Sequence, residues 1–494
     1  MTSSRIPGRF PPAGSSRIAD LIRQRRGARG LTPLDGALLH VPPVAEGWNL
    51  LLGAVRSKGK LPGDVREAMI LRVAALNDAA FEWIQHEPVG RDGGLTTGQL
   101  RLIRDTTIRF SGLTADQPPL TPLHSAALAF TDASTKEIKI PEDVFKQLKV
   151  SLSDLTVDDA DESKEYQTED LLAEAAAVVA TYNMVSRFLV SLDVAGKSDE
   201  AVPWPVDRRE HTVPLPESTD SSPQSLHVLT LTASPHLPWL VLVNSLLTNH
   251  TSWTLILPHL SKSYNVLLYD QRGHGKSTVP SPPTTTFGIL ADDIKLVLKT
   301  LEIPMPVHSV LGVSQGGATA LNFGRLYSPE LAKSIVACDT QAVGPQANIK
   351  AWDERIELAN EEDGMKKLAE ATVERWFPSP LHPNTRKDIV EMIASADVLG
   401  FEAGARSLQG YDLINPGEKE GGGPGLMDLE GVPVLLVAGE DDAGGKLAEG
   451  LRKLKGEWTK GNVQFLGVEG AGHLPMVDRT RAFAEGVIKF LEGV

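Results

Sequence analysis

The sequence predicts two domains of different class, an all-α domain followed by an α/β domain with a mainly parallel sheet. Residues 17 to 195 carry the apolar spacing of helices throughout. From residue 225 onward, short apolar runs alternate with helix-like segments, which is typical of strands joined by crossover helices. A chain of 494 residues is also too long for one ordinary core. We therefore expect a helical domain over residues 1–195 and an α/β domain over residues 225–494.

Composition narrows the classes of function. The formal net charge of -14 argues against broad binding to nucleic acid or to an anionic membrane, since both are negatively charged. Cys338 is the single cysteine, which excludes an intramolecular disulfide and a Cys-based metal cluster. The N-terminal residues resemble no signal peptide, and no run suits a bilayer span, so we expect a cytoplasmic protein without a bound metal.

The first domain is expected to consist of packed helices. Residues 18–26 and 121–130 each have helical spacing, and residues 65–84 predict one long helix. Residues 169–192 are rich in alanine and carry an apolar stripe of the kind that packs on a neighbouring helix or on a second subunit. We expect a homo-oligomer that assembles through this domain.

Residues 196–224 change character, because they place five prolines among serines and charged residues. This composition predicts a linker between the two domains.

The second domain contains seven strand candidates and one interruption. The candidates are residues 226–231, 239–243, 266–269, 307–311, 335–338, 434–437 and 463–466. Between about residues 345 and 415, charged helix-like segments occur without a strand. Such an insertion between strands predicts a helical lid over the site.

A serine nucleophile is the strongest local signal. Gly312 and Gly316 flank Ser314 in a G-x-S-x-G pattern, between an apolar run and a helix-like segment. This context predicts a nucleophile elbow, a sharp strand-to-helix turn that exposes the serine hydroxyl. Two backbone N–H groups should form the oxyanion hole, and we assign them to Gln315 and to Leu246 in the loop after an early strand.

An acid and a base follow the serine in the chain, each after a strand candidate. Asp442 comes after residues 434–437, and His473 comes after residues 463–466. We assign His473 as the general base and Asp442 as the acid that orients it, with the adjacent Asp441 as the alternative acid.

The second domain resembles 3-oxoadipate enol-lactonases. The resemblance is carried by residues 244–246 (Asn-Ser-Leu) with Thr248 and Trp253, by residues 269–277 (Tyr-Asp-Gln-Arg-Gly-His-Gly-Lys-Ser), and by lid residues that include Trp352, Arg355 and 375–377 (Arg-Trp-Phe). It covers about residues 228–491, and Leu247 stands where the family usually has glycine. The resemblance implies an α/β-hydrolase fold and a small anionic lactone as substrate. The expected substrate-binding residues are Asn244, Ser245, Trp352, Arg355, Arg375 and Trp376.

The first domain resembles the carboxymuconolactone decarboxylase superfamily, which includes alkylhydroperoxidase-like proteins. Residues 61–71 and 79–86 carry this resemblance. Thiol peroxidase chemistry is excluded, because Ala79 and Glu82 stand where that branch has its cysteines. The resemblance implies decarboxylation without a cofactor, since the lactone ring itself accepts the electrons. His86 is the candidate acid, with Glu82 orienting it and Glu67 as a relay; the alternative is a polar pair that ties helices together.

Three hypotheses follow. The leading one is a bifunctional enzyme of protocatechuate breakdown that decarboxylates 4-carboxymuconolactone and then hydrolyses the enol-lactone product. The first alternative is a serine esterase or lactonase for another substrate, with the helical domain as an oligomerisation scaffold. The second is a binding protein with vestigial sites.

Overall fold

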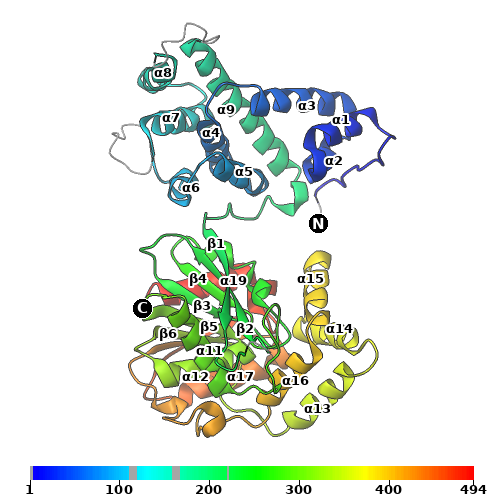
Figure 1. The fold of residues 1–494 in the computed structure, drawn as a ribbon, viewed down its shortest axis with the longest axis vertical. Coiled ribbons are helices and arrows are strands. Elements are labelled where there is room, and N and C mark those ends of the chain that lie inside the picture. Colours follow the sequence, from blue (N-terminus) through cyan, green and yellow to red (C-terminus); the bar gives the residue numbers. More distant parts are fainter. Residues whose placement is uncertain (1–3, 111–119, 158–166, 220–221) are drawn as a thin grey trace. The chain divides into compact units, whose positions relative to one another are not determined.

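The chain folds into two compact units, Met1–Pro205 and Val206–Val494, each with its own core. The computed structural model describes residues 4–110, 120–157, 167–219 and 222–494, and Figure 1 shows the helices and strands of both units. We call Met1–Pro205 the helical unit and Val206–Val494 the α/β unit. The predicted fold class is confirmed.

Helices form the whole regular structure of the described part of the helical unit. They are α1 (Arg17–Arg26), α2 (Pro33–Leu38), α3 (Pro42–Ser57), α4 (Gly63–Leu76), α5 (Ala80–Asp92), α6 (Thr97–Arg104), α7 (Pro122–Lys136), α8 (Glu142–Val157) and α9 (Thr168–Ser191). Residues 65 and 67–75 of α4 are all buried, so this helix lies at the centre of the core.

The prediction of one long helix over residues 65–84 is wrong. The structure ends α4 at Leu76 and begins α5 at Ala80. Asp78 between them has a φ of 49°, a left-handed conformation that aspartate tolerates better than most residues and that a continuous helix cannot contain.

Eight strands form one mixed sheet in the α/β unit. They are β1 (Asp207–Pro214), β2 (Ser225–Thr232), β3 (Trp239–Val243), β4 (Asn265–Tyr269), β5 (Val307–Val313), β6 (Ala332–Cys338), β7 (Pro433–Gly439) and β8 (Asn462–Val468). Their order is β1-β2-β4-β3-β5-β6-β7-β8, with β1, β2 and β4 joined antiparallel and every later pair parallel. Leu240 and Leu242 pack on one face of the sheet while Val241 and Val243 pack on the other, which explains why β3 is apolar without alternation.

The first strand corrects the predicted linker over residues 196–224. Asp207–Pro214 pairs with β2 along its whole length, and residues 220 and 221 lie outside the described part of the chain. The apolar pattern of the sequence does not reveal this strand, because it lies at the sheet edge, where most of its side chains face solvent and only Val213 is buried. Charged residues and proline are common on such edges.

Helices cover the sheet and fill the interval between β6 and β7. The interval holds α13 (Asn348–Ala359), α14 (Gly364–Trp376), α15 (Pro383–Ala394) and α16 (Val398–Ser407). The others are α10 (Leu257–Leu260), α11 (Phe287–Thr300), α12 (Gln315–Tyr327), α17 (Lys446–Glu457), α18 (Pro475–Asp478) and α19 (Thr480–Leu491).

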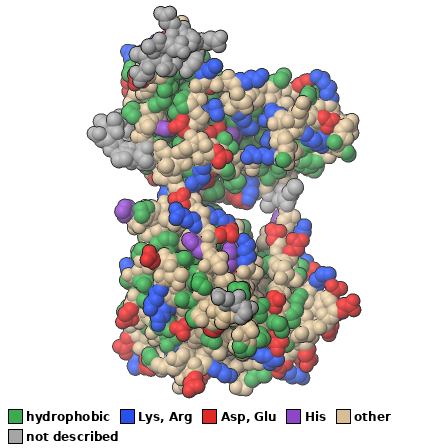
Figure 2. All heavy atoms as spheres, in the orientation of Figure 1, with side chains coloured by type: hydrophobic (Ala, Val, Ile, Leu, Met, Phe, Trp, Pro, Cys, Tyr) green, Lys and Arg blue, Asp and Glu red, His purple; other side chains and the backbone are tan. Residues whose placement is uncertain are grey.

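Charged side chains of both signs are mixed over the visible face of each unit (Figure 2). Within the described residues, we find no helix with the length and apolar character that a bilayer crossing requires.

Candidate active sites

Ser314 lies at a sharp turn that the flanking glycines make possible. It follows β5 and precedes α12, and its φ of 58° and ψ of -120° are strained for a residue with a side chain. A Cβ on Gly312 would lie 1.9 Å from the carbonyl oxygen of Gly316, and a Cβ on Gly316 would lie 2.3 Å from that of Val243. The two glycines therefore let the strand and helix approach closely enough to form the turn.

His473 and Asp442 meet at the ends of the last two strands. Nδ1 of His473 lies 2.7 Å from Oδ2 of Asp442, which is buried, whereas the alternative acid Asp441 is exposed and does not contact the imidazole. The backbone N–H of His473 donates to the carbonyl of Trp376 at the end of α14, and the two rings lie 5.1 Å apart. The helical insertion thus contacts the histidine directly.

One cavity of about 250 Å³ brings the serine, the histidine and the carboxylate together. Ser314, Asp442 and His473 line it, although no hydrogen bond joins the Ser314 hydroxyl to His473. Catalytic hydrogen bonds often tighten only when substrate binds. The arrangement can activate a serine for attack on an ester carbonyl.

The loop after β3 lines the same cavity as the serine. Leu246 lines the cavity, and Gln315 begins α12, where backbone N–H groups lack partners within the helix. The side-chain amide of Gln315 donates to Gly404 O and to Ser407 Oγ, so it anchors α16 beside the elbow. Leu247 has a φ of 69°, a conformation in which glycine is unstrained.

Two arginines in the cavity have no partner of opposite charge. Within the described residues, neither Arg355 nor Arg375 forms an ion pair or a hydrogen bond, and Arg355 lies over the ring of Trp352 at 4.5 Å. Burial and the nearby Arg355 lower the pKa of Arg375 to about 10, and burial also lowers the pKa of Arg355. Both stay cationic at neutral pH, and an anion in the cavity would supply the missing partner.

The structure places five of the six expected substrate-binding residues at the cavity and corrects the sixth. The cavity is lined by Ser245, Trp352, Arg355, Arg375 and Trp376. Asn244 does not line it, because its side chain turns back into the loop and donates to Ser245 O and Thr248 O at 3.0 and 2.6 Å. Asn244 therefore holds the shape of the loop.

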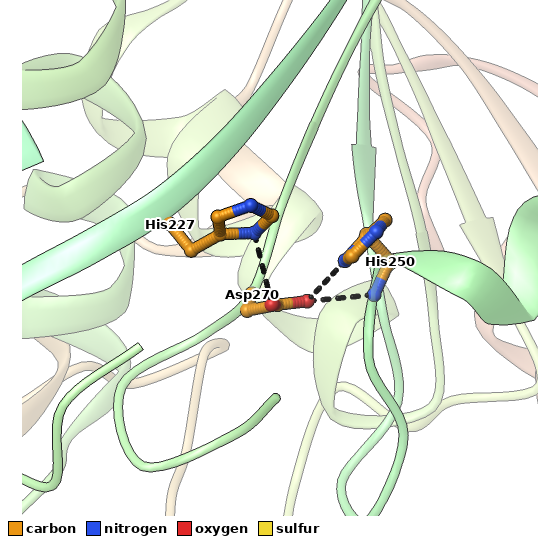
Figure 3. A group of neighbouring side chains, drawn as sticks. All are labelled: His227, His250 and Asp270. Atoms are coloured by element: carbon orange, nitrogen blue, oxygen red, sulfur yellow. Dashed lines mark hydrogen bonds and ion pairs between the residues drawn. The ribbon is translucent and has the colours of Figure 1, made fainter. Parts of the chain in front are cut away.

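A second cluster of titratable side chains consists of residue types that can bind a metal, but its carboxylate is engaged in hydrogen bonds. Figure 3 shows Nδ1 of His227 and of His250 pointing at Asp270, at 3.1 and 2.8 Å. The same carboxylate accepts the backbone N–H groups of His250 and Lys276. Four donors suit a carboxylate that ties β2, the loop after β3 and the turn after β4 together.

The helical unit has its own cavity of about 240 Å³ around His86. Nδ1 of His86 lies 2.8 Å from Oε2 of Glu67 on α4, and Nε2 lies 3.2 Å from the hydroxyl of Tyr182 on α9. Arg56 donates to the same hydroxyl at 2.6 Å. Burial is the largest effect on the pKa of His86 and lowers it, so the imidazole is neutral at pH 7. Its Nδ1–H then donates a hydrogen bond to Oε2 of Glu67.

Glu82 does not orient His86, which corrects the prediction from their spacing of four. Its Oε2 accepts a hydrogen bond from Ser186 on α9 at 2.9 Å, and its Oε1 is buried without a partner. Glu67, from the neighbouring helix, takes the orienting place instead. Burial raises the pKa of Glu82 well above its ordinary value, which favours the protonated form of this carboxyl group.

Sequence reasoning also missed the arginines around this cavity. Arg26, Arg29, Arg56 and Arg66 line it together with the three predicted residues. They come from α1, the short 3-10 helix Gly27–Arg29, α3 and α4, so no single motif contains them. Such a set of guanidinium groups suits a ligand with more than one carboxylate.

Two family matches divide the chain as the fold does. Residues 238–480 match the alpha/beta hydrolase fold family, and residues 42–117 match the carboxymuconolactone decarboxylase family. The chain joins a carboxymuconolactone decarboxylase family domain to an α/β-hydrolase domain related to 3-oxoadipate enol-lactonases.

The relatives of the α/β-hydrolase domain account for about half of the chain. 3-Oxoadipate enol-lactonase 2 of Acinetobacter baylyi is 28% identical over 250 residues, which are 51% of this chain and 87% of that protein. 3-Oxoadipate enol-lactonase 1 of the same organism is 28% identical over 267 residues, 52% of this chain and 90% of that protein. The crystal structure of the enol-lactonase from Burkholderia xenovorans LB400 has 27% identity and a TM-score of 0.47, and the match covers 55% of this chain and 97% of that one.

Proposed function

We propose that the α/β unit hydrolyses 3-oxoadipate enol-lactone to 3-oxoadipate. The observation that carries this proposal is the pair Arg355 and Arg375, which lie unpaired in the same cavity as Ser314. The enol-lactone offers a ring carbonyl for the serine and a free carboxylate for the guanidinium groups. Relatives with the name of this activity add support.

The chemistry follows from the roles of the residues. His473 takes the hydroxyl proton of Ser314 as the oxygen attacks the lactone carbonyl, and Asp442 stabilises the imidazolium. The oxyanion is held by the backbone N–H groups of Leu246 and Gln315. The C–O bond of the ring breaks, and the protonated His473 gives its proton to the enolate oxygen; the resulting enol, still part of the acyl group, becomes the ketone. Neutral His473 then takes a proton from water, which attacks the acyl group and releases it from the serine.

The test compares two lactones. Purified protein should hydrolyse the enol-lactone with a kcat/KM at least about 10-fold above that for α-angelica lactone, which has the same ring without the carboxylate, because a charge-assisted hydrogen bond contributes this much. Ser314→Ala should abolish both reactions. Faster turnover of an unrelated p-nitrophenyl ester than of the enol-lactone would favour the general esterase hypothesis instead.

We propose a second activity for the helical unit, decarboxylation of 4-carboxymuconolactone. The specific observation in its favour is a buried carboxyl group, Glu82, beside four arginines in one cavity, with a pKa that burial raises. Loss of CO₂ leaves a dienolate whose electrons spread into the lactone carbonyl, and one proton must then reach a ring carbon. Burial raises the pKa of Glu82 and lowers that of His86, so we assign the role of acid to Glu82 in place of His86.

This second activity is tested by CO₂ release from 4-carboxymuconolactone. Wild-type protein should release CO₂, and Ser314→Ala should release CO₂ and accumulate the enol-lactone. Intact enol-lactone hydrolysis without CO₂ release would remove the bifunctional hypothesis and leave the helical unit as a scaffold.

A further inference from the structure

Asp339 is a buried carboxyl group at the end of β6 that the triad chemistry does not use. It is 1% exposed, lines the cavity with Ser314, and has a φ of 44°. Its backbone N–H donates to Val437 O, and its Oδ1 accepts the backbone N–H of Gly439 at 2.8 Å. Both contacts are with β7, the strand that leads to Asp442, so the carboxyl group is fixed in place.

The second oxygen of this carboxyl group is buried without a donor. No donor among the described residues reaches Oδ2 of Asp339. Asp442 lines the same cavity, and its carboxyl group acts on that of Asp339 through both its charge and a side-chain hydrogen bond. Two ionised carboxylates have only acceptor atoms, so a hydrogen bond between them requires a proton on one of them. Oδ2 of Asp442 already serves as the acceptor for Nδ1 of His473, which leaves the role of donor to Asp339.

We propose that Asp339 is a positioning residue that stays protonated and donates a hydrogen bond to Asp442. This inference rests on the proposed hydrolase function of the α/β unit. The O–H of Asp339 and the Nδ1–H of His473 then occupy the two sides of the Asp442 carboxylate, which fixes its rotamer and, through it, the orientation of the imidazole. The proton stays on Asp339 throughout the reaction, so no bond changes there.

The surroundings of Asp339 keep the proton in place over a range of pH. Burial, then the carboxylate of Asp442 and, more weakly, that of Asp478, raise the pKa of Asp339 well above its ordinary value. His473 and Arg375 are the other charged or titratable groups that face Asp442. As the pH rises through the raised pKa, Asp339 ionises, the hydrogen bond is lost and two carboxylates repel each other. Activity should therefore fall on the alkaline side.

Two substitutions of Asp339 test its hydrogen-bond donor and its ionisable charge separately. Asp339→Asn keeps a hydrogen-bond donor of the same shape that cannot ionise, so kcat should stay within about threefold and the alkaline fall should disappear. Asp339→Ala leaves Asp442 without its buried donor, so kcat should drop about 10- to 100-fold with little change in KM. Asp428→Asn, at an exposed residue paired with Lys460, is the control for loss of one charge.

The readouts are kcat and KM for the enol-lactone from pH 6 to 10, and the rate at which a fluorophosphonate labels Ser314 over the same range. Thermal unfolding checks that each variant is folded, and Asp339→Asn keeps the test valid where Asp339→Ala fails to fold. An alkaline limb that persists in Asp339→Asn overturns the inference. So do wild-type labelling rates in Asp339→Ala. Failure of the probe to label Ser314 in wild-type protein contradicts the proposed function itself, so the two failures are distinguishable.

Discussion

Arg375 is the residue on which substrate selection depends most. Arg375 forms no ion pair or hydrogen bond with any residue that the structure describes, and burial in the cavity lowers its pKa to about 10. A substrate carboxylate would satisfy it, so Arg375→Ala should raise KM for the enol-lactone about 10- to 100-fold while kcat changes less. The KM for α-angelica lactone should not change. Arg386→Ala is the matched control, since Arg386 lies on α15 in ion pairs with Glu370 and Glu374. An unchanged KM for the enol-lactone would remove Arg375 from the proposal.

The raised pKa of Glu82 predicts how the free energy of unfolding depends on pH. Its native pKa is raised by burial, whereas the unfolded value is about 4.3. Between these two pKa values the native state holds one proton more than the unfolded state, so the free energy of unfolding falls by about 1.4 kcal/mol per pH unit as the pH rises. Glu82→Gln removes this dependence. Urea unfolding of both proteins at pH 5 and pH 8 measures it, with Glu142→Gln on the exposed side of α8 as control.

The raised pKa of Glu82 also predicts how the decarboxylase activity depends on pH. CO₂ release should decline as the pH rises through the raised pKa of Glu82, because the ionised carboxylate has no proton to donate. Decarboxylation by Glu82→Gln at the wild-type rate would return the role of acid to another group, with His86 and Tyr182 as the remaining candidates in the cavity.

At the scale of elements, the elbow between β5 and α12 depends on its glycines. A Cβ on Gly312 would meet the Gly316 carbonyl at 1.9 Å, so Gly312→Ala must move the backbone of the turn. We expect a loss of about 1–3 kcal/mol in the free energy of unfolding of the α/β unit, together with loss of lactonase activity. Gly450→Ala on α17 is the control, because nothing lies within 4 Å of its Cβ. That change should stabilise the helix by about 0.5–1 kcal/mol.

The elements also show which features a sequence can predict. Buried parallel strands such as β3 are continuous apolar runs. Ser314 and Asp442 follow two such strands, β5 and β7, and His473 follows the half-buried β8, so the order of the apolar runs located the cavity. The edge strand β1 carries no such run, because only one of its residues is buried. The strand β1 is recognised only from its pairing with β2 in the folded sheet.

Partners that come from different elements were harder to predict. The spacing of Glu82 and His86 placed both on one face of α5, but the hydrogen bond to His86 comes from Glu67 on α4, across a helix packing that no local pattern fixes. Asp339 resembled an ordinary residue at a strand end. Its importance depends on the distance between the ends of β6 and β7, which is a property of the folded sheet.

At the scale of the whole molecule, the two cavities lie in separate compact units, and each is lined by residues of its own unit. The proposed product of the helical unit is the proposed substrate of the α/β unit. Variants of the two sites should therefore complement each other. Glu82→Gln should lack CO₂ release but hydrolyse added enol-lactone, and Ser314→Ala should convert 4-carboxymuconolactone only as far as the enol-lactone.

An equimolar mixture of these two variants should convert 4-carboxymuconolactone fully to 3-oxoadipate, since a small lactone released by one molecule can diffuse to the α/β unit of another. The measurement is the time course of lactone absorbance and of 3-oxoadipate formation at equal site concentrations. The mixture should show a lag that shortens as the concentration of Ser314-intact protein rises, because the intermediate must first accumulate in solution. Wild-type protein should show the same lag when the concentration of hydrolase sites is matched. A lag that is absent only in the wild-type protein would contradict free diffusion and would mean that the two units must belong to one molecule for the reactions to be coupled.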